Sequence, residues 1–210
     1  VRNIVIGNDA AQILGTATGS DDDNIMIGHE SGMNVNTSKN VMIGTASGQY
    51  VSTGTDNTFV GYNTGKGLID NTNNNASKNV IIGTDSSHII DSGSQNIVVG
   101  ASAAQSLTSG SRNIILGSES TSAEGSSGPA RSLTTGNENI IMGSESALLL
   151  TAGNNNIVMG NNSGAKMNTT SNTIIIGVDS GNELSSSSDS NAVIIGHGAA
   201  QKITQGSSIV

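Results

Sequence analysis

A short apolar phrase that ends in glycine returns eleven times along this chain. The first copy is Ile4-Val5-Ile6-Gly7, and the steps between successive glycines are 16 to 26 residues, most often 17. The other ten copies end at Gly28, Gly44, Gly61, Gly83, Gly100, Gly117, Gly143, Gly160, Gly177 and Gly196. A fixed unit with occasional insertions is typical of a stacked repeat architecture. Positions are numbered below from this glycine, which is position 0.

The triplets at positions −3 to −1 predict short β-strands rather than helices. They are too short for helical periodicity and rich in Ile and Val, while Gly and Asn recur between them. Residues −3 and −1 share one face of a strand, and residue −2 points to the other face. Because both faces are apolar, with Thr58 the one polar exception, we expect each strand to be buried on both sides.

We expect the outer pair of each triplet to build the coil interior and the middle residue to form a second apolar stripe. A row of eleven exposed apolar residues would be an aggregation surface on a monomer. Three chains side by side would bury that stripe along a common axis. The pattern therefore predicts a homotrimer or another homo-oligomer.

The remaining positions predict how each coil closes. The glycine permits a sharp corner, and the residue at +3 is always Ala, Ser or Thr, which suits a tight interior. A weaker apolar position follows and predicts a second short strand. Its residues are Leu14, Met33, Val51, Leu68, Ile89, Leu107, Leu133, Leu149, Met167, Leu184 and Ile203.

Asparagine occupies position −4 in nine copies and predicts a ladder of stacked amides. Thr173 and Ala192 replace it in the last two copies, where we expect an altered corner. The insertions should project outward as loops. They cover Gly19–Asp23, Leu68–Ser77 and Thr121–Ala130.

These features predict an all-β fold: a parallel β-solenoid, or β-roll, of eleven to twelve coils near 17 residues each. Residues 1–210 form a single repeat domain. The chain starts at Val1, just before a triplet, and ends at Ser208-Ile209-Val210, which looks like a twelfth repeat cut short. We therefore expect a fragment of a longer fibre.

Composition narrows the class of protein further. With 28 Gly, one Phe, two Tyr and no Trp, the core must be thin layers of aliphatic side chains. Triplets in register with glycine argue against disorder. The net charge of −8 argues against nucleic acid as a partner, and the lack of cysteine excludes disulfides and thiolate metal sites. No apolar run approaches the roughly 20 residues that span a bilayer.

Two stretches resemble known repeat families. The phrases 40–47 (Asn-Val-Met-Ile-Gly-Thr-Ala-Ser) and 191–196 (Asn-Ala-Val-Ile-Ile-Gly) resemble head repeats of trimeric autotransporter adhesins of the YadA type. That resemblance implies a left-handed parallel β-roll, three chains side by side and a role in binding surfaces. The phrase 57–65 is similar to repeats of phage and virus tail fibres. The unit here is longer than the adhesin coil and its middle residue is larger, which implies a wider coil or a differently packed axis.

Few residues suggest chemistry. His29 and His197 share position +1 but lie nine coils apart, so they cannot share a metal ion within one chain, and no Ser-His-Asp set can be proposed. His88 is the third histidine, and like the other two it is interpreted as a solvent-facing side chain. We predict no catalytic residue, no cofactor and no metal site.

Carboxylates recur at position +2, namely at Asp9, Glu30, Asp85, Glu119, Glu145 and Asp179. Glu119 and Glu145 belong to successive coils, so stacking would place them roughly 4.8 Å apart. Paired acids could cleave a glycosidic bond or hold Ca²⁺, but the favoured interpretation is a solvated acidic edge. The run Asp21-Asp22-Asp23 is interpreted as an exposed loop.

The aromatic residues Tyr50 and Tyr62 could form a small patch on which sugar rings stack, although ordinary packing beside an insertion is favoured. Tyr50, Tyr62, Glu119 and Glu145 are the candidate surface-binding residues.

Together the residues and the resemblance predict a structural and adhesive segment of an extracellular fibre, on a cell surface or a virion. It would present loops to a glycan or protein receptor on a cell surface or matrix. One alternative is a self-assembling filament subunit without receptor specificity. The other is a polysaccharide-degrading β-helix of a phage tail fibre.

Overall fold

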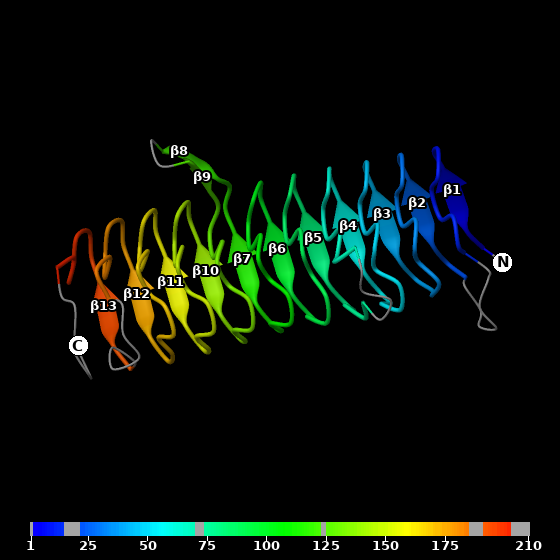
Figure 1. Ribbon diagram of the computed structural model, residues 1–210. Coiled ribbons are helices and arrows are strands. Elements are labelled where there is room, and N and C mark those ends of the chain that lie inside the picture. Colours follow the sequence, from blue (N-terminus) through cyan, green and yellow to red (C-terminus); the bar gives the residue numbers. More distant parts are fainter. Residues whose placement is uncertain (1, 15–21, 70–73, 123–124, 185–190, 203–210) are drawn as a thin grey trace.

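Each triplet forms one strand of a single parallel sheet. The computed structural model describes residues 2–14, 22–69, 74–122, 125–184 and 191–202. The strands stand side by side along a rod, with the N-terminal coil at one end and the C-terminal coil at the other (Figure 1). They are β1 (Ile4–Ile6), β2 (Ile25–Ile27), β3 (Val41–Ile43), β4 (Thr58–Val60), β5 (Val80–Ile82), β6 (Ile97–Val99), β7 (Ile114–Leu116), β10 (Ile140–Met142), β11 (Ile157–Met159), β12 (Ile174–Ile176) and β13 (Val193–Ile195). The predicted parallel β-solenoid is confirmed.

The register never slips between coils. Phe59 of β4, for example, lies between Met42 of β3 and Ile81 of β5. Because side chains alternate between faces with a period of two, an equal register stacks equivalent residues in columns along the rod. Every position of the repeat is therefore a column.

The middle residue of the strand, not the outer pair, lies in the coil interior, except that Val5 of β1, in the terminal coil, is 42% exposed. The residues at −2 from Met26 of β2 to Ile175 of β12 are fully buried, and Ile194 of β13 is 3% exposed. The residues at −3 and −1 point outward and are half-buried or exposed. The expectation that the outer pair builds the core and the middle residue forms the outer stripe is therefore wrong. The middle residue shares its face with the buried asparagine at −4, whereas the outer pair shares its face with charged residues at −5.

The opposite wall of the coils consists of turns, and among the described residues the expected second strand is not formed. From Ala11 to Ala200 the residue at +4 has a φ of 43° to 61°, which no extended strand adopts; in the β7 coil, where Thr121 at +4 lies in the hairpin, Ala130 has this conformation with a φ of 50°. Backbone hydrogen bonds still join the coils here, as from the Gly48 N–H to the Thr64 carbonyl at 3.0 Å. The buried residues of this wall are Val35, Val51, Ile90, Leu107, Leu133, Leu150, Met167 and Leu184. At three of the apolar positions named from the sequence, a nearby residue is the buried one instead. Val35 is buried instead of Met33, Ile90 instead of Ile89, and Leu150 instead of Leu149.

The side chains at −2 and +4 face each other across the coil interior, and a large side chain at −2 requires a small residue at +4. Met26, Met42 and Phe59, which are the largest middle residues, each belong to a coil with glycine at +4. A Cβ atom added to Gly65 would lie 2.7 Å from the Phe59 ring. The smaller Val98 allows Ala104 at the same position and nearly the same φ. Phe59 lies in the coil whose wall residue, Leu68, is 38% exposed rather than buried.

The predicted asparagine ladder is confirmed. The side-chain amide of Asn96 donates to Asn79 Oδ1 at 3.0 Å and to the Gly110 carbonyl at 2.9 Å. Its Oδ1 accepts from both the backbone N–H and the side chain of Asn113, each at 3.0 Å. The amide is thus fully hydrogen-bonded while fully buried. Each such side chain joins its coil to the coils before and after it.

The altered corner expected at Thr173 and Ala192 is not found. Ile174 N–H donates to the Ala192 carbonyl at 2.8 Å, as the first residue of the other strands does to the next coil. The residues before them, Asn172 and Asn191, have φ values of 57° and 66°, close to the 57° to 65° of the other −5 positions that adopt a left-handed backbone. The backbone of the coil therefore keeps its shape without the asparagine side chain at −4, and only the ladder of side-chain amides ends here.

The third insertion projects from the rod as a small antiparallel hairpin of β8 (Ser120–Ser122) and β9 (Gly125–Ser127) (Figure 1). Leu68 and Ile69, at the start of the second insertion, are exposed as expected. Residues 19–21, 70–73 and 203–210, which include Asp21, Ile203 and the expected twelfth repeat, lie outside the described residues. Small residues at +3, such as Ser47 and Ser86, are buried as expected. Within the described ranges, no helix has the length and apolar character to cross a membrane.

Candidate interaction surface

The outward side of the sheet is an apolar strip that runs the whole described length of the rod. We call it the apolar face, and it consists of the residues at −3 and −1 of each strand. Six of its side chains are 37–66% exposed, and the others are partly buried by their neighbours in the columns. These six are Ile4, Ile6, Val80, Ile82, Ile97 and Ile195. Thr58 is its one polar member.

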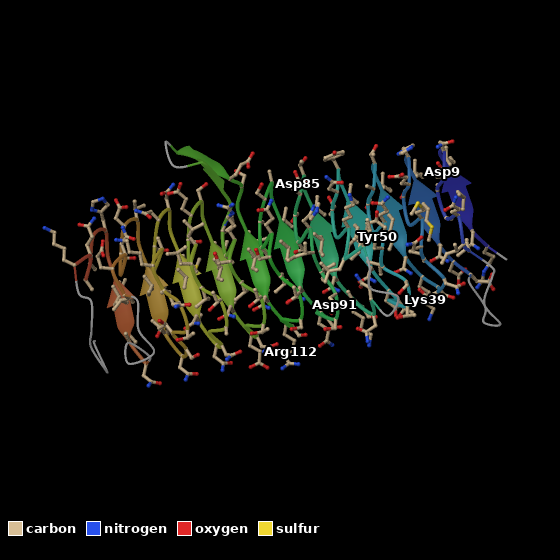
Figure 2. The ribbon with its side chains drawn as sticks, viewed as in Figure 1. Asp9, Lys39, Tyr50, Asp85, Asp91 and Arg112 are labelled. Carbon is tan, nitrogen blue, oxygen red and sulfur yellow. The ribbon has the colours of Figure 1, made fainter. Side chains whose placement is uncertain are left out.

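A column of charged residues borders the apolar face on the side where the strands begin. This charged column consists of the exposed residues at −5, and along β1 to β10 charges on adjacent strands always have opposite signs, with the uncharged Gln95 between Lys78 and Arg112. Its members in that order are Arg2, Asp23, Lys39, Asp56, Lys78, Gln95, Arg112 and Glu138. Arg2 binds Asp23, and Arg112 binds Glu138, with N–O distances of 2.7 and 2.8 Å. Figure 2 shows Lys39 and Arg112 along this long edge.

The column at −5 continues without charge beyond β10, as Asn155, Asn172 and Asn191. Stacked like charges would repel at the spacing of adjacent strands, and alternation replaces that repulsion by attraction. The four basic residues of this column are thus half of an alternating ladder.

A column of mostly uncharged residues borders the other side of the apolar face. This polar column consists of the residues at +1, and it includes His29, Tyr62 and His197 among Asn, Ser, Thr, Ala and Val. Tyr62 is 52% exposed. The His29 ring nitrogen lies 3.7 Å from Glu30, and the His88 ring nitrogen, at a different corner, lies 3.5 Å from Asp85.

The recurring acids at +2 lie on the edge of the rod opposite the charged column, where Figure 2 labels Asp9 and Asp85. Most of them accept hydrogen bonds from neighbouring coils rather than meeting another acid. Glu119 accepts from the Ser102 hydroxyl at 2.9 Å, and Asp85 accepts from the Asn63 amide at 3.0 Å. Glu119 and Glu145 do follow one another, with the hairpin β8–β9 leaving the corner directly after Glu119. In the part of the chain that is described, no three His, Asp or Glu side chains gather as a metal site.

The two tyrosines occupy different columns. Tyr50 is at +6 on the turn-built wall, and the Lys66 ammonium lies 5.8 Å from its ring centre. Tyr62 stands at +1 beside the apolar face. Their repeat positions therefore separate them on the coil perimeter, and Tyr62 alone borders the candidate surface.

A shallow hollow of about 380 Å³ lies on the turn-built wall. Its lining residues are Ser132, Leu149, Thr151, Lys166 and Asn168, none of which is an acid. Lys166 is bound to Glu183 at 2.7 Å. Glu119 and Glu145 lie at +2, whereas the hollow is lined by positions +6 and +8, so the paired acids do not flank it.

The signal that identifies the apolar face was present in the sequence. Residues −5, −3 and −1 share a parity, and a column with alternating full charges belongs in water. The triplet alone does not show which of its residues face outward, because all three of its positions are apolar. Extending the alternation by two residues assigns the outer pair to the surface.

Comparison with known proteins identifies no relative of this chain. No protein-family model matches the chain, and neither the curated proteins nor the solved structures contain a match.

Proposed function

We propose that this chain is a structural segment of an extracellular fibre, in which copies of the chain pack together through the apolar face. Its projecting hairpin and corner loops would contact a glycan or protein receptor on a cell surface or matrix. The observation that carries the proposal is the apolar face, interrupted by Thr58 alone, along a rod built of stacked coils. Adhesion rests on the hairpin β8–β9, which stands clear of the rod (Figure 1).

The size of the surface supports contact between copies. Eleven strands at about 4.8 Å spacing give a length of about 50 Å, and the span from −5 to +1 adds a width of about 20 Å. The resulting area of about 1,000 Å² exceeds the roughly 800 Å² per partner of a standard protein interface. An apolar centre between two polar borders is the usual anatomy of such an interface.

The number of copies remains a prediction. Three chains around a common axis would bury three apolar faces together, as the resemblance to trimeric adhesins implies. The stripe that faces a partner is now the outer pair of each strand rather than the middle residue. A homotrimer and other homo-oligomers both cover it.

Mass measurement with matched variants tests the proposal. Multi-angle light scattering or native mass spectrometry should report an oligomer of the 21.0-kDa chain. The double variant Val80→Lys and Ile97→Lys introduces charge into the apolar face and should release monomers with an unchanged circular dichroism spectrum. Ser92→Lys, an exposed site on another side of the coil, should leave the mass unchanged. A wild-type monomer at all concentrations would contradict the proposal.

A self-assembling filament without a receptor is the second candidate, and it would lengthen by end-to-end stacking of the terminal coils. In that case the purified protein should form filaments that lengthen with time without any ligand. Deletion of residues 120–127 should then leave attachment to cells unchanged. In the fibre proposal, the same deletion should reduce attachment to cells while the oligomer mass per chain stays constant.

A further inference from the structure

Resting on the proposed contact between copies, we infer that two copies pack face to face with their rod axes antiparallel. A two-fold axis would pass between β4 and β5, perpendicular to the rod. Strand β1 of one copy would then face β10 of the other, β2 would face β7, β3 would face β6 and β4 would face β5. The partner of this surface is thus a second copy in one defined register.

The order of charges along the charged column carries this inference. In chain order from β1 to β10, the signs at −5 are plus, minus, plus, minus, plus, neutral, plus and minus. A two-fold axis along the strand direction places −5 columns opposite each other in reverse order. In the stated register six of the eight positions face an opposite charge, the other two pair a lysine with Gln95, and no like charges face each other.

The two ion pairs seen within one chain would meet in this arrangement. Arg2 would face the second copy's Glu138, and Asp23 would face its Arg112. Each pair is already held at 2.7–2.8 Å. Two such pairs opposite each other form a square of alternating charges, in which every charge has two opposite neighbours. Packed sheets lie about 10 Å apart, a gap that two long side chains can bridge from opposite sides.

A slip by an odd number of strands sets like charges opposite each other, and a slip by two strands leaves four positions facing an opposite charge instead of six. Complete antiparallel overlap of all eleven strands would set β4 against β10 and β5 against β7. Asp56 would then face Glu138, and Lys78 would face Arg112, which are like charges. A parallel arrangement related by an axis along the rod would place the charged column opposite the polar column. Its charges would meet mainly Asn, Ser and Thr, with His29 and Tyr62 the titratable residues at +1 among β1 to β10.

The overlap is large enough for a stable contact. Eight strands at about 4.8 Å, over a width of about 20 Å, cover about 770 Å² per copy, close to the standard 800 Å². The strands β11 to β13, whose −5 residues are uncharged asparagines, would extend beyond the overlap. Both hairpins β8–β9 would leave the pair along the same long edge, about 24 Å apart along the rod.

Cysteine pairs test the register, because the chain has no cysteine of its own. In the double variant Asp23→Cys and Arg112→Cys, the two thiols of one chain lie five strands apart, about 24 Å. A short bis-maleimide cross-linker therefore cannot join them within a chain. Across the proposed pair they face each other, so the full-length protein should become a covalent dimer of twice the 21.0-kDa chain mass.

Two matched variants report the competing arrangements. Lys39→Cys with Thr45→Cys places thiols at −5 and +1 of one coil, and it links chains only in parallel, in-register assemblies. Lys39→Cys with Glu138→Cys links an antiparallel pair slipped by two strands. Both should stay unlinked under conditions that link the first variant, and all three should keep the wild-type circular dichroism spectrum.

The outcomes separate this inference from the proposed function. An oligomer that links through Asp23→Cys and Arg112→Cys alone supports both. An oligomer that links through either of the other pairs, or a trimer by mass, overturns the antiparallel register and leaves the fibre proposal standing. A monomer that no pair cross-links overturns both. An oligomer that no pair links overturns the register, because the linker reaches across facing −5 columns.

Discussion

Replacing Ile81 or Ile82 by alanine tests which face of the strand forms the core. The two residues are neighbours in β5 and have the same side chain, but Ile81 is fully buried and Ile82 is 38% exposed. The same atoms are removed in both variants. Any difference in stability therefore reports the environment of the side chain alone.

The structure sets the expected magnitudes. Ile→Ala removes three carbon atoms, worth about 2.4 kcal/mol when fully buried. At Ile81 a cavity term adds to this, because Phe59 and Val98 are fixed in register on either side and limit collapse. We expect a loss of about 3–4 kcal/mol. At Ile82 about 60% of the transfer term applies and no closed cavity forms, so we expect a loss of about 1–1.5 kcal/mol.

Urea unfolding followed by circular dichroism measures the two losses, and hydrogen exchange in β4 to β6 measures them locally if coils unfold separately. The measurements should be made at low protein concentration, where association through the apolar face contributes least. Equal losses, or a larger loss for Ile82→Ala, would refute the assignment of the middle residue to the core. At high concentration Ile82→Ala should also weaken association, whereas Ile81→Ala should not do so selectively.

Three further results are expected. Gly65→Ala should cost about 1–3 kcal/mol by overpacking against Phe59, and adding Phe59→Val should recover part of the thermal stability, since a Val–Ala pair already occupies another coil. Asn96→Ala should lower the free energy of unfolding measured in urea by about 2–4 kcal/mol, because the buried groups that it binds are left without a hydrogen-bond partner. A loss below about 1 kcal/mol would show that the ladder contributes little. Deleting residues 84–100 brings two basic −5 residues together, whereas deleting residues 144–160 removes an uncharged one. The first variant should be less stable by about 0.5 kcal/mol, and added salt should shrink that difference; a difference insensitive to salt would contradict the role of charge.

The strand positions, the glycine corners and the asparagine ladder were all predictable from the sequence. They depend only on the repeat itself, since equal spacing brings equivalent residues together whatever the coil shape. Asn96 could be assigned to a stacked ladder without knowledge of its other partners. The interior was harder, because Ile81 and Ile82 look alike within a triplet of apolar residues. Lys78, four residues before Ile82 and on the same face, distinguishes them.

The turn-built wall could not be read from the sequence in the same way. Position +4 adopts a left-handed backbone in Ser87 and Ala104 as well as in glycines such as Gly48. Serine and alanine give no sequence signal for a left-handed backbone. The apolar residue that follows within three positions therefore looked like part of a strand. The hairpin β8–β9 was also predicted only as a loop. Its Ser- and Gly-rich sequence carries little strand preference.

Of the candidate site, the existence of an outward apolar stripe was predictable, but its position was not. Glu119 and Glu145 do occupy successive coils as expected, and the structure adds Ser102 as a partner of the first. Tyr50 and Tyr62 were grouped by closeness in sequence, whereas their repeat positions place them in different columns. Sequence distance misleads in a solenoid, because neighbours in space are separated by a whole coil.

Stacking about 17 residues into each coil also determines how the rod responds to tension. Across the described residues, hydrogen bonds between coils join each coil to the coils before and after it, as Asn96 joins Asn79 and Asn113. A coil advances the rod by about 4.8 Å, yet its released chain can extend to about 58 Å. A pull on the two ends would therefore peel coils away one at a time, each adding about 50 Å of length. Such a rod absorbs mechanical work in discrete steps before it breaks.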